Sequence, residues 1–274
     1  MIRTARIAAL AAACLLGAHA TAFATWSVVA VDRKTGTIVI ASATCVPQAG
    51  LERFPAKDLR DVQAIVVPGV GGAAAQAGVD ATRASQRLIF TELQKGTAPE
   101  QIIALLKQDP QFIRRQFGIV DLQGHTATVS GGGNLPVAVD RHGRVDGTEI
   151  YYAIQGNILA NEAVVTDAVA ALTSSSGELT DRVMAAMEAA DARGGDNRCS
   201  CEKGVKPTAS CTTRTAYVAY ILRADKTDRN GESFNDGEYA LYLSVTDANI
   251  TPEEDANPVK TLRQRYDRWK QSRK

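Results

Sequence analysis

Two β-rich runs joined by a short turn constrain the fold of this chain more than any other feature. The run TWSVVAV begins at Thr25, the run TIVIASAT ends at Thr44, and the turn-forming segment DRKTG separates them. A turn this short joins antiparallel neighbours. The sequence therefore predicts a β-hairpin in which Thr25 lies opposite Thr44 and Cys45.

The rest of the chain alternates between blocks of strands and blocks of helices. We expect strands near residues 62–67, 73–77, 116–122, 125–130, 151–155, 214–223 and 239–245, and helices near residues 79–95, 99–108, 160–172, 178–192 and 257–271. This order fits antiparallel sheets covered by helices better than a β-α-β alternation. We expect an α+β fold in which two stacked, mainly antiparallel sheets lie between helical layers, with residues 25–274 as one domain.

The first 24 residues have the three regions of an export signal. Arg3 and Arg6 form a positive n-region, residues 7–16 form an apolar core, and the sequence AFA before Thr25 is a small-x-small cleavage site. We therefore expect a signal peptide over residues 1–24 and an exported chain, periplasmic or secreted.

The charge balance excludes several function classes. The chain has 31 lysines and arginines against 30 acids, and loss of the two leader arginines would leave 29 against 30, a net charge of −1. Nucleic-acid-binding domains carry a basic surface instead. No run of 18 apolar residues follows the leader. We expect neither a nucleic-acid partner nor a membrane span, and an oligomer is left open.

The cysteines indicate disulfides. Four of the five follow the leader, an even number that suits an exported protein. Cys199 and Cys201 are one residue apart, whereas zinc sites space their cysteines by two to four. A bridge between these two would close a strained ring. Two pairings remain open, in which Cys45 joins either Cys199 or Cys201 and Cys211 joins the other.

Histidine and glycine patterns point away from metal and cofactor chemistry. Outside the leader only His125 and His142 occur, both beside glycine in predicted turns and not at metal-ligand spacing. The segment GVGG lacks the Lys-Ser/Thr of a phosphate-binding loop, and DKTDRNG lacks the flanking carboxylates of a calcium loop. We expect no cofactor and no metal.

Cleavage after the leader would make Thr25 the N-terminal residue. A free N-terminal threonine carries its own general base, because its α-amine has a reference pKa of about 7.7 to 8.0 and can accept the hydroxyl proton. No histidine is needed for such a nucleophile. Cleavage at the competing site AHA would expose Thr21 instead, four residues ahead of the strand.

Several segments resemble one family. TWSVVAVDRKTG with IASATC, then RRQFGIVDLQG, YAIQGNILA and ARGGDNRC, are similar in order to the family called domain of unknown function 1028. The resemblance extends from Thr25 to about Leu262 and is most specific at QGNIL and GGDNRC. That family is placed in the N-terminal nucleophile (Ntn) hydrolase superfamily. The resemblance thus implies a four-layered αββα sandwich and a Thr, Ser or Cys nucleophile exposed by processing.

Carried onto this chain, the resemblance gives Thr25 as nucleophile and its amine as base. The hairpin places polar residues of the second strand beside that amine, a bridge from Cys45 brings the GGDNRC segment to the same end, and QGNIL supplies an oxyanion donor. The candidate site residues are Thr25, Asn157, Ser42, Thr44, Asp196 and Asn197. Each residue other than Thr25 also has an ordinary structural interpretation. Ser42 and Thr44 can simply fill a strand face, Asn157 can cap the helix that follows, and Asp196 and Asn197 can form a turn in the disulfide loop.

The expected function is hydrolysis of an amide bond, in a small molecule or a peptide, through an acyl-enzyme ester. One departure is that residues 37–45 contain no lysine, which Ntn peptidases carry near their nucleophile on the early strands. The alternative is a secreted or envelope binding protein that keeps the fold without catalysis.

Overall fold

The predicted hairpin forms and lies at the centre of the larger of two sheets. The computed structural model describes residues 25–53 and 56–273, so the predicted leader lies outside the described residues. Strands β1 (Thr25–Asp32) and β2 (Thr37–Thr44) pair antiparallel, with Thr25 opposite Thr44. Gly36 ends the turn in the left-handed region, with φ +75°.

The first sheet has six strands, in the order β10-β9-β2-β1-β8-β7, and every neighbouring pair is antiparallel. Its other members are β7 (Val139–Arg144), β8 (Ile150–Asn157), β9 (Val218–Ala224) and β10 (Leu241–Thr246).

The second sheet has four strands, in the order β3-β4-β5-β6, again with antiparallel neighbours. Its strands are β3 (Ala64–Val67), β4 (Gly71–Ala77), β5 (Arg115–Asp121) and β6 (Thr126–Ser130).

Seven α-helices occur within the described residues. They are α1 (Gln48–Arg53), α2 (Leu59–Gln63), α3 (Ala84–Gln94), α4 (Pro99–Leu106), α5 (Ala163–Ser174), α6 (Leu179–Ala192) and α7 (Pro258–Gln271). None of the helices in this part of the chain is both long and apolar enough to cross a membrane.

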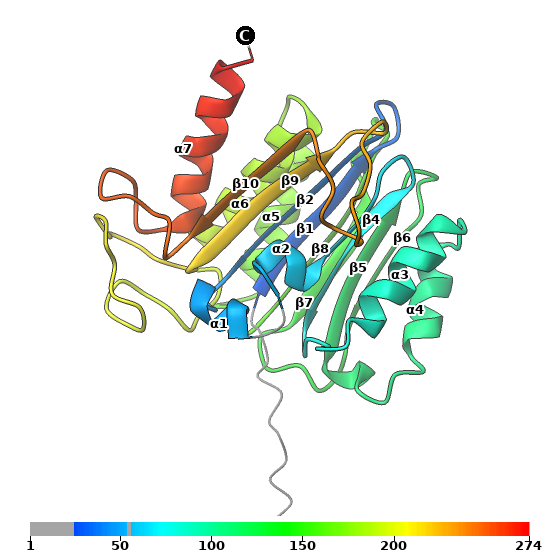
Figure 1. Cartoon of the computed structure of the whole chain (residues 1–274), viewed down its shortest axis with the longest axis horizontal. Helices are drawn as coiled ribbons and strands as arrows, with labels where there is room; N and C mark the ends of the chain where they lie inside the picture. The colour runs from blue at the N-terminus through cyan, green and yellow to red at the C-terminus, as the bar shows by residue number, and fades with distance from the viewer. Residues whose placement is uncertain (1–24, 54–55, 274) are drawn as a thin grey trace, which may run out of the picture.

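Side-chain alternation explains how the sheets pack. Successive residues of a strand point to opposite faces, so Trp26 and Val28 of β1 pack with the buried side chains of α5 and α6. Val29 and Val31 point the other way and pack with Val66 and other residues of the second sheet. The outer face of the second sheet is covered by α3 and α4. Figure 1 shows α5 and α6 behind the six-stranded sheet, and α3 and α4 beside the other.

Local hydrogen bonds shift several predicted boundaries. The predicted strand at residues 62–67 begins only at Ala64, because Asp58 caps α2 by accepting the Asp61 N–H at 2.8 Å. The predicted helix at residues 79–95 begins only at Ala84, because Asp80 accepts the N–H groups of Thr82 and Ala84 and holds that segment in a turn.

Three of these helices and strands were not predicted. The short helices α1 and α2 were missed, and β7 was missed because its sequence, VDRHGR, is polar. The placement of His142 in a turn was therefore wrong: His142 lies within β7, opposite Ala153, and its ring bonds the Thr126 hydroxyl at 2.8 Å.

Candidate functional site

Three polar residues form a row across neighbouring strands at one end of the larger sheet. Thr25 of β1 lies opposite Thr44 of β2 on one side and opposite Asn157 of β8 on the other. Directly opposed residues share a face of the sheet, and alternation puts Thr25 on the same face as Val29 and Val31, toward the second sheet. Each member of the row is at most 1% exposed.

The side chain of Asn157 is buried without hydrogen bonds. Within the described residues neither its Oδ1 nor its Nδ2 has a partner, although the residue is 0% exposed. An unpaired buried polar group costs about 1–3 kcal/mol, so few survive in folded proteins without a reason. The next residue, Ile158, has φ +53°, a left-handed conformation that is rare for a β-branched residue and is found mostly at functional sites.

The disulfides bring the GGDNRC segment to this end of the sheet. Cys45 pairs with Cys199 and Cys201 pairs with Cys211, with Cα–Cα distances of 5.7 and 5.8 Å. One of the two pairings that the sequence left open is thereby selected. The Cys45 N–H also donates to Asp196 Oδ2 at 2.9 Å.

Asp196 is a fully buried carboxylate held by an arginine. Arg198 donates from its backbone N–H and its Nε to Asp196 Oδ1, at 3.1 and 3.0 Å, and from Nη2 to Oδ2 at 2.8 Å. A buried charge needs such pairing. Asp196 therefore fixes the segment just after Thr44, beside the row.

Asn197 lies outside the buried part of the site. It is exposed, its N–H donates to Ile158 O at 3.2 Å, and its Nδ2 lies 3.4 Å from Leu159 O. The preceding Gly195 has φ +49°, and a Cβ there would lie 2.5 Å from the Trp26 ring, so only glycine fits. Asn197 thus holds the chain that follows Asn157, and does not join the row.

Ser42 shares the face of the row but lies deeper in the sheet. It opposes Ser27, its hydroxyl donates to Trp26 O at 2.7 Å, and its Oγ lies 3.1 Å from Gln63 Oε1. The first contact lies within the hairpin, and the second joins the hairpin to α2.

Glutamines between the two sheets were not predicted as site residues. Gln76 Nε2 donates to the Thr25 carbonyl at 3.0 Å and to Gln116 Oε1 at 2.7 Å, and Gln76 Oε1 accepts the Ser27 hydroxyl at 2.7 Å. Gln116 Nε2 donates to Gly156 O at 2.9 Å. The pair thereby ties the backbones of Thr25 and of the residue before Asn157 to the second sheet.

The sequence carries one signal for these glutamines. Gln76 and Gln116 stand in the apolar contexts AAAQA and QFGIV, where a strand buried on both faces has only apolar neighbours. A buried amide in such a run needs partners. Which partners it meets depends on how the sheets stack, which the run itself does not encode.

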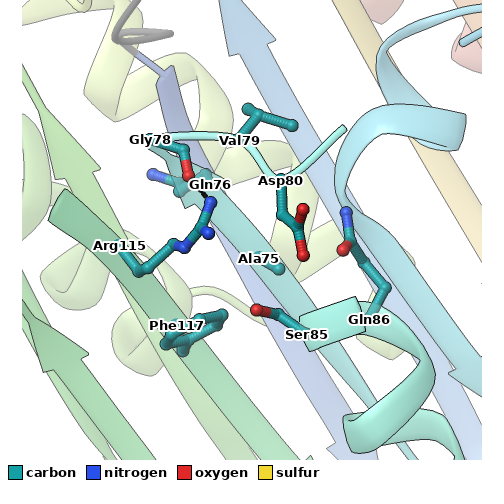
Figure 2. Close-up of a pocket in the computed structure, with 9 residues that line it drawn as sticks. All are labelled: Ala75, Gln76, Gly78, Val79, Asp80, Ser85, Gln86, Arg115 and Phe117. Atoms are coloured by element: carbon teal, nitrogen blue, oxygen red, sulfur yellow. Dashed lines mark hydrogen bonds between the residues drawn. The ribbon is translucent and has the colours of Figure 1, made fainter. Parts of the chain in front are cut away.

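A groove lies beside Gln76, at the end of the second sheet. A narrow cavity of about 10 Å³ is lined by Gln76, Asp80, Ser85, Gln86 and Arg115 among others. Two hollows of about 480 and 530 Å³ adjoin it and share Asp80 and Arg115 with it. We call the three together the Asp80–Arg115 groove. Figure 2 shows that Gln76 forms one wall of the narrow cavity, so the groove is separated from the Thr25 carbonyl by one hydrogen-bonded side chain.

Burial alone would raise the pKa of Asp80, but hydrogen bonds from the Thr82 hydroxyl and backbone, and the nearby Arg115 charge, hold this pKa below its usual range. Asp80 is therefore ionised near neutral pH. In residues 25–53 and 56–273 no three His, Cys, Asp and Glu side chains gather closely enough to hold a metal ion.

Comparison with known proteins identifies the family. Residues 25–230 match the family of unknown function DUF1028, and the chain belongs to this family. The crystal structure of protein SPO2555 from Silicibacter pomeroyi, itself assigned to DUF1028, has a similar fold, with a TM-score of 0.63 and 20% sequence identity. The match covers 89% of this chain and 85% of that chain. No curated protein matches the sequence.

Proposed function

We propose that this protein is an exported N-terminal nucleophile hydrolase that cleaves an amide bond through Thr25. The observation that carries the proposal is the buried carboxamide of Asn157, which has no partner in the described part of the chain and lies directly opposite Thr25 on the neighbouring strand. A hydrogen-bond donor without a partner, placed beside a potential nucleophile, is suited to hold negative charge that develops only during reaction.

The packing of the elements supports the superfamily as well. Two stacked antiparallel sheets, with α5 and α6 against one and α3 and α4 against the other, match the four-layered αββα sandwich that the resemblance implies. A nucleophile in that architecture opens a central strand, as Thr25 does.

The reaction requires removal of residues 1–24. In the uncleaved chain the Thr25 nitrogen is part of a peptide bond, and an amide nitrogen is not a base. Processing after Ala24 would create the α-amine. The two disulfides support export, because such bonds persist in oxidising compartments.

The chemistry proceeds in two halves. The α-amine takes the proton of Thr25 Oγ, which attacks the substrate carbonyl carbon, and Asn157 Nδ2–H holds the resulting oxyanion. The C–N bond breaks, the ammonium returns its proton to the leaving amine, and an ester on Thr25 is left. Water then attacks this ester with the amine again as base, and releases a carboxylic acid.

Gln76 and Gln116 act as positioning residues in this scheme. Through the Thr25 and Gly156 carbonyls they fix the separation of nucleophile and oxyanion donor. Asp196, held by Arg198, keeps the end of β2 in place beside them.

Burial favours the second candidate, a binding protein without catalysis. Thr25, Ser42, Thr44, Asn157 and Asp196 are all at most 1% exposed in the uncleaved chain, whereas a working nucleophile needs access to substrate. The two candidate functions differ in one respect: in the hydrolase, removal of residues 1–24 gives a substrate access to Thr25, Thr44 and Asn157, and in the binding protein it does not.

A small β-lactone tests the proposal, since it acylates an activated hydroxyl. The processed protein should gain one adduct, and peptide mapping should place it on Thr25. Thr25→Ala should gain none, while Thr37→Ala, a substitution at the far end of the same hairpin, should label like the wild type. Labelling that persists in Thr25→Ala, or none in a processed wild type, would favour the binding protein.

A further inference from the structure

The Asp80–Arg115 groove contains a buried acceptor that nothing in the fold uses. Gln86 is 1% exposed and its Nε2 donates to Val62 O at 2.8 Å, but its Oε1 has no partner among the described residues. Figure 2 shows the Gln86 amide directed toward Asp80 and the Ser85 hydroxyl directed into the same cavity. A ligand that brings an N–H donor here would satisfy this oxygen.

Each hollow of the groove has an exposed aliphatic side chain among polar and charged ones. The exposed large hydrophobic residues of the described chain are Leu105, Ile113 and Leu135, at 37%, 59% and 52%. Leu105 lines one hollow and Ile113 lines the other. Two of the three thus lie in the groove, and exposed apolar side chains in a hollow are typical of binding surfaces.

Asp80 and Arg115, the two charged residues that all three cavities share, are already hydrogen-bonded. Arg115 Nε donates to Asp109 at 3.0 Å, and another of its nitrogens donates to Gly78 O. The Asp80 oxygens accept from Thr82 and Ala84 at 2.9 Å. A charged ligand group at this position would have to compete with these bonds, so the position suits an uncharged group, while the exposed Arg114 lines only one of the hollows.

We propose that the Asp80–Arg115 groove binds an uncharged peptide segment whose aliphatic side chains enter the two hollows and whose main-chain N–H donates to Gln86 Oε1. Alternate residues of an extended peptide point to the same face and lie about 6.5–7 Å apart, and the two hollows adjoin each other at Asp80 and Arg115, which line both. Gln76 lines the groove and also donates a hydrogen bond to the Thr25 carbonyl. The bound segment would therefore be the part of the substrate next to the scissile amide. This last link rests on the proposed function.

Binding can be measured without chemistry on a ¹⁵N-labelled Thr25→Ala protein. Titration with N-acetyl-Leu-Ala-Leu-amide should shift amide signals of residues 78–88 and 105–115, and N-acetyl-Asp-Ala-Asp-amide should bind at least about tenfold more weakly, as expected from the loss of one or two buried aliphatic groups. Ile113→Asp, a change at an exposed site, should raise the Kd of the leucine peptide by about tenfold. Ala192→Asp, an exposed position on α6, should not.

A second pair of variants tests the role of Gln86 Oε1 as acceptor. Gln86→Leu should raise the Kd of the leucine peptide by several-fold, whereas Gln94→Leu, at an exposed position on the same helix, should leave this Kd unchanged. Equal affinity for both peptides, shifts outside the groove, or an Ile113→Asp protein that binds like its parent would overturn the inference. Peptide binding without β-lactone labelling of the wild type would uphold the groove and contradict only the hydrolase.

Discussion

Among single residues, the proposed oxyanion donor Asn157 is a side chain that does not stabilise the fold. Asn157 is buried, neither of its polar side-chain atoms has a partner among residues 25–53 and 56–273, and it lies opposite Thr25 in register. Residues that serve function often do so at the expense of local stability. The neighbouring left-handed Ile158 has the same character.

Asn157→Ala should therefore separate activity from stability. Loss of an oxyanion donor typically lowers rate by about 10² to 10³, so β-lactone labelling should slow by that order. The free energy of unfolding should not fall, because no hydrogen bond to the described residues is lost and the cost of about 1–3 kcal/mol for the unpaired carboxamide is removed. Asn161→Ala, at an exposed residue whose Nδ2 donates to Arg193 O, is the control. Unchanged labelling in Asn157→Ala would remove this residue from the mechanism.

Gln76→Leu tests whether the glutamine pair positions the nucleophile. It removes the donor to the Thr25 carbonyl, and Gln155→Leu removes a comparable inter-sheet bond, to Ala74 O at 3.0 Å, elsewhere. Gln76→Leu, which removes three hydrogen bonds, should cost more unfolding free energy than Gln155→Leu, which removes one and should cost about 1–3 kcal/mol. Only Gln76→Leu should slow labelling, by about tenfold or more, measured where circular dichroism shows both variants folded. Equal slowing in both would indicate a structural role alone.

Among the secondary-structure elements, the hairpin is the one whose strand register could be predicted from the sequence. The run lengths and the DRKTG turn fix the register, so Thr25 opposite Thr44 was predicted and is confirmed. Asn157 was placed at a strand end, but its position beside Thr25 depends on β8 pairing with β1, which no local pattern specifies. The glutamine pair and the groove depend on how two sheets stack, and for that reason they emerge only from the structure.

Helix α7 offers a pH test at this scale. A hydrogen bond from Arg265, with a further one from Arg268, lowers the pKa of Glu254 from 4.5 to about 2. Between these values the unfolded chain binds a proton that the folded one does not, so the stabilisation is complete above about pH 4.5 and is lost as the pH falls toward 2. Because these ion pairs lie near the surface, solvent screening limits the stabilisation from the ionised Glu254 to about 1–2 kcal/mol.

Glu254→Gln should accordingly lower the unfolding free energy at pH 6 and have little effect near pH 2. Urea unfolding at both pH values measures this difference. A variant that loses equal stability at both pH values would show that packing, and not the charge of Glu254, anchors α7.

For the molecule as a whole, the two disulfides should contribute unequally to the free energy of unfolding. Cys45–Cys199 closes a sequence separation of 154 residues and Cys201–Cys211 one of 10. Loop-closure entropy predicts about 5 kcal/mol for the first and about 3 kcal/mol for the second. Denaturant unfolding of the two Cys→Ser pairs should follow that order. The reverse order would mean that strain or residual unfolded structure outweighs loop length.

Lengthening the mature N-terminus by one residue tests whether Thr25 acts through its own amine. The wild type processed to Thr25 should form a single β-lactone adduct on that residue, whereas a chain with one alanine left ahead of Thr25 should form none, because its Thr25 nitrogen is an amide. Intact-mass spectrometry reports both the N-terminus and the adduct. Equal labelling of the two proteins would contradict the mechanism.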